Sequence, residues 1–142
     1  MIVLDGKKTA QDLKEEIKIT VSEIRKNGQR SPHLAAILVG NDGASLTYVG
    51  SKVRSCKYVG FNSTLIHLDE STSEEILLKK ITELNQDDEL DGYIVQLPLP
   101  NHINEEKILL AIDPKKDVDG FHPSNFGRMA LEMDAFIPAT PF

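Results

Sequence analysis

The chain is poor in several features that would each point to a particular class of protein. It has one cysteine and no tryptophan among 142 residues. A single cysteine excludes an intramolecular disulfide framework and favours the cytoplasm as the compartment. The first residues have neither a basic region nor a long apolar core, which argues against a signal peptide. No apolar run is long enough to span a membrane.

Positive charge is also scarce, since 16 basic residues stand against 22 acidic ones and the formal net charge is −6. Without a basic run or patch, the chain is not expected to bind nucleic acid. Its four histidines are scattered without ligand spacing, so no metal site is expected. Cys56 falls on the apolar stripe of a predicted helix, which favours a core residue over a nucleophile.

What is present is a regular alternation of helical and extended patterns in a chain long enough for one domain, residues 1–142. Strands separated by helices indicate a three-layer α/β/α fold with a mainly parallel sheet. Apolar runs predict strands over 33–39, 62–68 and 92–96, and a short β segment over 2–4. Helical spacing predicts helices over 9–26, 45–59, 104–112 and 124–131, and one from 71–73 to about 84.

Two of these helices carry apolar stripes that should face the core. In the first helix, apolar residues recur at helical spacing, namely Ala10, Leu13, Ile17, Val21 and Ile24. In the second, the stripe consists of Leu46, Val49, Val53 and Cys56.

The stretch from Ser45 to Lys52 is the first that suggests chemistry. It follows an apolar strand and the turn sequence Gly40–Gly43, and ligands bind at the carboxyl ends of strands in α/β folds. Tyr48 and Lys52 are four residues apart and share one helical face. On spacing alone, an amphipathic flank with solvated tips is the favoured interpretation.

Two later stretches are further candidates. In Val95–Pro100, Gln96 stands at a strand end before two prolines, and we predict a cis bond at Leu97-Pro98 or Leu99-Pro100. The alternative is a strand exit in which the backbone satisfies Gln96. In 116–121, Asp119 precedes a glycine, which allows close approach to a ligand. The alternative there is an ordinary acidic turn.

Together these stretches resemble the bifunctional methylenetetrahydrofolate dehydrogenase/methenyltetrahydrofolate cyclohydrolase family of bacteria. The family pattern contains Ser-x-x-Tyr-x-x-x-Lys, Val-Gln-Leu-Pro-Leu-Pro, Lys-Asp-Val-Asp-Gly and Pro-x-Thr-Pro, which stand here at 45–52, 95–100, 116–120 and 138–141. Each motif is short, but the ordered set is specific and covers almost the whole chain. One departure is Ala139, where many members have cysteine.

The larger departure is at the end of the chain. The family's nicotinamide-cofactor domain follows Pro-x-Thr-Pro, whereas this sequence ends at Phe142, and no Gly-rich strand-turn-helix fingerprint occurs in it. The resemblance therefore implies an N-terminal catalytic, folate-binding domain that lacks the Rossmann domain. NADP would be bound mainly by that absent domain, so dehydrogenase activity would need it.

The resemblance implies two activities in one-carbon metabolism and purine biosynthesis: oxidation of 5,10-methylenetetrahydrofolate with NADP, then hydrolysis to 10-formyltetrahydrofolate. Lys52 would be the central residue for hydrolysis, because a partly desolvated lysine can exchange protons near neutral pH. Gln96 would hydrogen-bond Lys52, and Tyr48 would pack on the folate. Asp119 would accept paired bonds from the pterin, and Leu97, Pro98 and Leu99 would line the pocket.

Two other functions are alternatives to this one. Short-chain dehydrogenases also use Tyr-x-x-x-Lys, but they need a Gly-rich turn upstream of the tyrosine, and nothing before Tyr48 supplies one. A folate-binding module without catalysis is the non-enzymatic alternative. Family resemblance also implies a homodimer for the full-length protein, paired largely outside these residues, which leaves a monomer open for residues 1–142.

Overall fold

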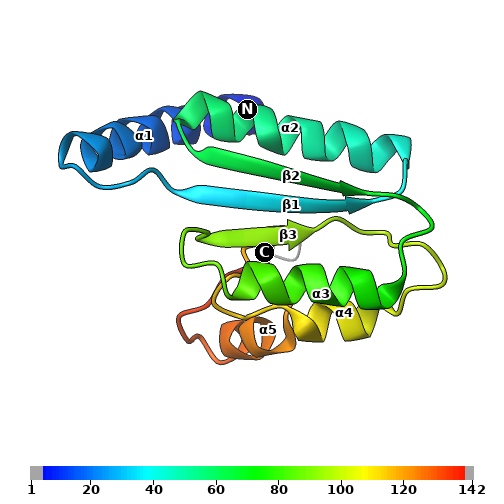
Figure 1. Ribbon diagram of the computed structural model, residues 1–142. Helices are drawn as coiled ribbons and strands as arrows, with labels where there is room; N and C mark the ends of the chain where they lie inside the picture. The colour runs from blue at the N-terminus through cyan, green and yellow to red at the C-terminus, as the bar shows by residue number, and fades with distance from the viewer. Residues whose placement is uncertain (1–4, 140–142) are drawn as a thin grey trace.

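A computed structural model describes residues 5–139 of the chain. Its elements follow the alternation expected from the sequence, and Figure 1 shows them in order. They are α1 (Gly6–Lys26), β1 (His33–Val39), α2 (Gly43–Val59), β2 (Asn62–Leu68), α3 (Glu74–Asn85), β3 (Gly92–Val95), α4 (Glu105–Ala111) and α5 (Pro123–Ala130). The predicted β segment at residues 2–4 lies outside the described residues.

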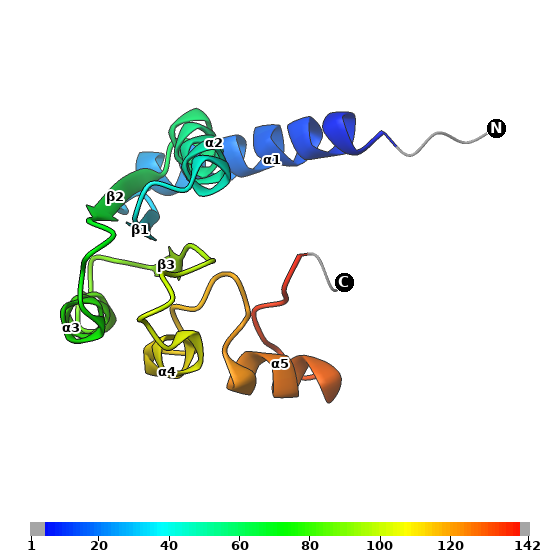
Figure 2. The same cartoon turned by 90° about the vertical axis from the view of Figure 1, so that its right-hand side faces the viewer.

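The three strands form one parallel sheet in the order β2-β1-β3. Helices α1 and α2 cover one face and α3 and α4 the other, which confirms the α/β/α layers (Figures 1 and 2). From β1 the chain passes to β2, which lies on one side of β1, and then to β3, which lies on the other side of β1. In doubly wound sheets of this kind, such a reversal opens a crevice at the carboxyl ends of the two strands concerned, here β1 and β3.

The alternation of side chains along β1 supplies a core on each face of the sheet. Ala35, Ile37 and Val39 pack with buried residues of α3 and α4, including Leu77, Ile81 and Ile108. On the opposite face, Ala36 packs with Val49 of α2 and Ile94 of β3. A strand buried on both faces explains why the sequence of β1 is apolar after His33.

Two apolar stripes are less buried than predicted. In α1 only Val21 is buried, while Leu13 and Ile17 are 52% and 42% exposed. In α2, Val49 is buried and Val53 packs beside it, but Leu46 is 40% exposed. The periodicity identified both helices correctly, whereas burial depends on whether a neighbour covers the stripe. Within residues 5–139, no helix is both long and apolar enough to cross a bilayer.

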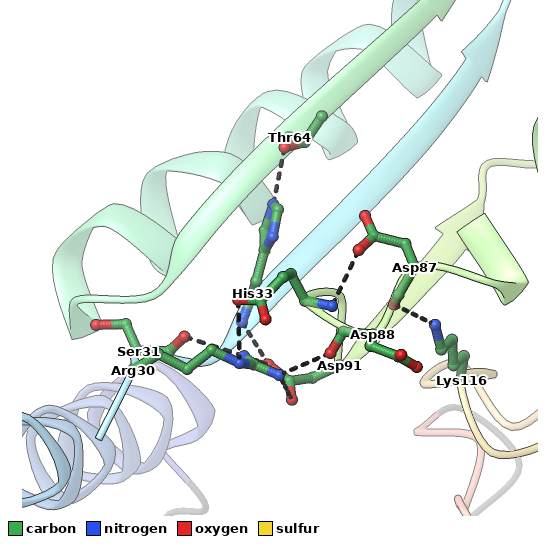
Figure 3. Close-up of polar contacts among 9 residues, drawn as sticks. Arg30, Ser31, His33, Thr64, Asp87, Asp88, Asp91 and Lys116 are labelled. Carbon is green, nitrogen blue, oxygen red and sulfur yellow. Dashed lines mark hydrogen bonds and ion pairs between the residues drawn. The ribbon is translucent and has the colours of Figure 1, made fainter. Parts of the chain in front are cut away.

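At the amino ends of the strands, polar side chains tie the loop after α1 to the start of β3 (Figure 3). Arg30 contacts both oxygens of Asp91, with Nη1–Oδ2 and Nη2–Oδ1 distances of 2.7 and 2.9 Å. Asp91 Oδ2 also accepts the backbone N–H of His33 at 2.7 Å. These bonds, chiefly that from Arg30, lower the pKa of Asp91. Asp91 therefore joins two segments far apart in sequence.

We expect Arg30→Gln to lower the free energy of unfolding only modestly near neutral pH, because both partners are substantially exposed and solvent screens the ion pair. A lowered pKa in the folded state means that the stabilisation is present above the unfolded value of about 3.9 and is lost as pH falls through the folded value. Urea unfolding at several pH values should show the difference from wild type shrinking in acid. Lys14→Gln on α1, where the lysine forms no ion pair within residues 5–139, is the control. A pH-independent difference would contradict the assignment.

Candidate functional site

The site is built where β1 and β3 end, and α2 supplies its first two side chains. Gly40 turns the chain after β1 with a φ of 81°, a conformation that glycine adopts without strain. Asp42 then caps α2 by accepting the N–H of Ser45 at 2.8 Å, and this bond lowers the pKa of Asp42. The cap fixes the start of the helix, and therefore the face on which Tyr48 and Lys52 lie.

Lys52 is held between a carboxylate and an aromatic ring. Its Nζ lies 3.4 Å from each carboxylate oxygen of Asp119, although 67 residues separate the two. It also lies 4.9 Å from the centroid of the Tyr48 ring. The side chains of Lys52 and Asp119 are 31% and 35% exposed, so the pair is partly shielded from water. Tyr48 itself is 59% exposed, which leaves its ring accessible.

Gln96 has a different set of partners from the one expected. Its backbone N–H bonds Ile37 O and its Nε2 bonds Leu97 O, at 2.9 and 2.8 Å. The expected bond to Lys52 is not formed, because Lys52 is paired with Asp119. Within residues 5–139 the buried Oε1 of Gln96 finds no donor. An acceptor left unpaired at the site is costly and is available to a ligand or to a shifted Lys52.

The loop after β3 contains the predicted cis peptide bond, at Leu97-Pro98. Leu97 and Pro98 border the cavity beside Tyr48. Leu99 turns the other way: it is buried in the core beneath α3 and α4, and its N–H bonds the Glu105 carboxylate at 3.0 Å. Leu99 therefore anchors the loop and borders only the larger cavity described next.

Two cavities meet at this end of the sheet. A cavity of about 260 Å³ is lined by Tyr48, Gln96, Leu97, Pro98 and the first turn of α2. A larger one, of about 970 Å³, lies over the loops that follow all three strands and shares Asp42 and Pro98 with the first. None of Tyr48, Lys52, Gln96 and Asp119 lines the larger cavity. Tyr48 and Gln96 line the smaller cavity, whereas Lys52 and Asp119 line neither, and Lys52 adjoins the smaller one through its contact with the Tyr48 ring.

The loop that carries Asp119 reaches α2 by packing beside β3. Tyr93 N–H bonds Lys116 O at 2.9 Å, and Asp117 forms a parallel bridge with Tyr93. Val118 then packs with the core residues between α2 and the sheet. Its side chain occupies the space that a Cβ on Gly92 would need, since the two would be 2.3 Å apart. This close approach directs the next residue, Asp119, toward Lys52.

Several residue roles were not predicted from the sequence. Lys116 Nζ bonds the carbonyls of Leu84 and Asp87, so this member of the third motif supports the end of α3 and not the site. Asp42 and Ser45 line the small cavity; the turn before α2, with Asp at the N-cap, was the signal for them. Within residues 5–139, no cluster of His, Cys, Asp and Glu could hold a metal ion.

The arrangement offers three chemical functions in one place. Asp119 can accept two hydrogen bonds from a planar donor edge once Lys52 releases it. The exposed ring of Tyr48 can stack on a flat heterocycle. Lys52 can give or take a proton at an atom held over that ring. A flat, nitrogen-rich ligand that undergoes proton transfer fits these three functions.

Comparisons with known proteins agree with this geometry. Residues 4–119 match the family described as tetrahydrofolate dehydrogenase/cyclohydrolase, catalytic domain. The bifunctional protein FolD of Flavobacterium johnsoniae is 70% identical over all 142 residues of this chain, which correspond to 48% of that protein.

Two solved structures have the same fold. The bifunctional FolD dehydrogenase/cyclohydrolase of Campylobacter jejuni superposes with a TM-score of 0.95 at 44% identity, over 99% of this chain and 50% of that one. The Trypanosoma brucei enzyme, solved with NADP cofactor and an inhibitor, gives a TM-score of 0.91 at 31% identity, over 96% of this chain and 47% of that one.

The chain thus spans about half the length of the relatives it matches. The matched region contains Tyr48, Lys52, Gln96 and Asp119. The chain belongs to the tetrahydrofolate dehydrogenase/cyclohydrolase family and carries its catalytic domain.

Proposed function

We propose that this chain is the N-terminal folate-binding domain of a bifunctional enzyme of one-carbon metabolism. The enzyme oxidises 5,10-methylenetetrahydrofolate to 5,10-methenyltetrahydrofolate and hydrolyses the product to 10-formyltetrahydrofolate. The observation that carries the proposal is the meeting of Lys52, Asp119 and Tyr48 beside a cavity at the carboxyl end of the sheet. Lys52 is the catalytic residue for hydrolysis in this proposal.

The pterin ring presents an amide N–H and an amine on one planar edge, which matches the two oxygens of Asp119. Without ligand, Lys52 already bonds both oxygens, so the pterin has to displace it. Gln96 Oε1, buried and unpaired among the described residues, is an acceptor for the displaced ammonium group. Substrate binding would then place Lys52 beside Gln96 with its protons directed at the one-carbon bridge, where water attacks.

The residues of this chain do not fit a dinucleotide. The turn after β1 reads Gly-Asn-Asp-Gly and leads into α2, whose first turn faces the small cavity. It lacks the spaced glycines that bring a helix N-terminus against a pyrophosphate. We propose that NADP, as hydride acceptor, is bound mainly by residues outside 1–142. This chain holds the folate so that its methylene carbon faces that cofactor.

The direct test is to assay both activities on the full-length protein and on residues 1–142. The full-length protein is expected to reduce NADP with 5,10-methylenetetrahydrofolate and to hydrolyse 5,10-methenyltetrahydrofolate. Residues 1–142 alone are expected to show no hydride transfer, because the acceptor has no site on them. Hydride transfer by the purified domain would contradict the division of roles, and an inactive full-length protein would contradict the function.

We further propose a cytoplasmic location and a homodimer for the full-length protein, paired largely outside this domain. The single half-buried cysteine is compatible with a reducing compartment. Sedimentation of the full-length protein and of residues 1–142 tests the pairing. A dimer of the full-length protein and a monomer of the domain are expected. A dimer formed by the domain alone would place the interface within these residues.

A further inference from the structure

One buried carboxylate near the site has no part in the chemistry described so far. Asp117 is 3% exposed and lies two residues before Asp119. Within residues 5–139 no cationic side chain forms an ion pair with it. A buried carboxylate is costly unless hydrogen bonds compensate it. The hydrogen-bond partners of the Asp117 carboxylate therefore indicate its structural role.

Asp117 is compensated by N–H groups from the segment that follows Asp119. Its Oδ2 accepts the backbone N–H of His122 at 2.8 Å and Nδ2 of Asn125 at 2.9 Å. Its Oδ1 accepts the backbone N–H of Phe121 at 3.3 Å. Asn125, 4% exposed, also bonds Pro114 O and so connects α5 to the start of the same loop. The carboxylate thus fastens the chain on both sides of Asp119.

Gly120 fixes the turn between Asp117 and Phe121 through its backbone conformation and its close contacts with the segment near residue 136. Its φ is 70° and its N–H bonds Asp117 O at 3.1 Å. A Cβ at this position would lie 2.6 Å from Phe136 O and 2.8 Å from Pro138 N. The backbone around Asp119 is therefore held between the Asp117 cluster and the segment near residue 136. Only the Asp119 side chain extends from this clamp toward Lys52.

We propose that Asp117 is a positioning residue for ligand binding: by holding Phe121, His122 and Asn125, it keeps the Asp119 carboxylate aimed at the donor edge of the folate. This rests on the proposed function, because the affinity it controls is affinity for folate. Within residues 5–139, no hydrogen bond joins Asp117 to Lys52 or to a residue that lines the small cavity, so its influence on Asp119 passes through the loop.

The test is a double-mutant cycle between Asp117→Asn and Asp119→Ala in the full-length protein, with tetrahydrofolate as the calorimetric probe. Asparagine keeps the size of the side chain and one acceptor oxygen, but it loses the negative charge and turns an NH₂ group toward at least one N–H donor, so the loop is held more weakly. Hydrogen bonds to charged groups correspond to roughly 10- to 150-fold in an equilibrium constant. We expect Asp117→Asn to weaken tetrahydrofolate binding at least about tenfold when Asp119 is present, and by less than about twofold in the Asp119→Ala background.

Two further variants separate positioning from general loss of stability. Ile81→Val removes one methyl from the core under α3, away from the loop, and should lower the melting temperature without changing the dissociation constant. Asn125→Ala removes one donor from Asp117 but leaves the His122 bond, so it should weaken binding in the same direction by less. Asn125→Ala also replaces Asp117→Asn as the test variant if Asp117→Asn does not fold.

Unchanged affinity in Asp117→Asn, or equal weakening in both backgrounds, would overturn the proposal. If Asp117→Asn does not fold, unchanged affinity in Asn125→Ala would overturn it. Failure of the wild-type protein to bind tetrahydrofolate would instead overturn the proposed function.

Discussion

Replacing Lys52 with methionine in the full-length protein is expected to remove hydrolysis of 5,10-methenyltetrahydrofolate almost completely. Methionine keeps the length and the apolar stem but has no proton to exchange. A positioned general acid or base contributes about 10²–10⁴-fold, so hydrolysis should fall at least that far. Loss of the ammonium also leaves Asp119 without its partner at 3.4 Å, which frees that carboxylate for the ligand.

The dehydrogenase activity of Lys52→Met should fall much less, because hydride transfer depends chiefly on holding the folate against the nicotinamide. Lys52→Arg should not restore hydrolysis, since a guanidinium stays charged and cannot act as a base. The measurement is both activities on each variant, with folate affinity determined separately. Hydrolysis near the wild-type rate in Lys52→Met would contradict this prediction. Lys52 would then be a solvated residue on the flank of α2, and its contact with Asp119 would have no catalytic role.

Replacing Asp119 with alanine should weaken folate binding strongly while the fold stays intact. The side chain is 35% exposed and its ion-pair partner within residues 5–139 is Lys52, so no core packing is lost. Truncating one partner of a charged, hydrogen-bonded pair in a binding site costs about 2–5 kcal/mol, much of it from the donors left unpaired. Calorimetry with tetrahydrofolate measures the loss, and thermal unfolding checks the fold.

Asp119→Asn is the matched control for that result. It keeps the shape but offers one acceptor in place of two, so its affinity should lie between those of wild type and Asp119→Ala. Both variants also remove the charge beside Lys52. Affinity equal to wild type in Asp119→Ala would show that the carboxylate serves only the ion pair. The alternative of an ordinary acidic turn would then be the better description.

The sheet could be predicted closely because its signals are local. The bounds of β1 and β2 agree with the predicted 33–39 and 62–68, since each strand is a run of seven residues ended by turn or polar sequence. The starts of α3 and α4, which Ser73 and Asn104 cap, lie close to the predicted positions. Helix α1, in contrast, begins at Gly6 after the cap Asp5, three residues before the predicted start. The strand predicted over 92–96 ends at Val95, although Gln96 N–H still bonds Ile37 O.

The site was less predictable, because its contacts join distant segments. The family resemblance identified four site residues, and the structure gathers them at one end of the sheet. They are Tyr48, Lys52, Gln96 and Asp119. The structure does not form the expected Lys52–Gln96 bond, since a carboxylate 67 residues away competes for the same ammonium. The cluster around Asp117 had no sequence signal at all: it consists of polar side chains without periodicity, brought together by a turn.

The exposure of the apolar stripe of α1 also could not be predicted from the helical periodicity. The spacing of Leu13 and Ile17 identifies a helical face, but only the tertiary structure shows that nothing within residues 5–139 covers it fully. The same limit applies to Leu99, which the motif placed at the pocket and the structure places in the core. Side-chain direction at a loop depends on the path of the whole loop.

The most direct test of the account is a crystal structure of the full-length protein with bound tetrahydrofolate. The account predicts the pterin edge on both oxygens of Asp119, the ring against Tyr48, and Lys52 moved from Asp119 toward Gln96 Oε1. A folate bound instead in the larger cavity, over Asn41, Asp69 and His102, with the Lys52–Asp119 pair intact, would contradict it.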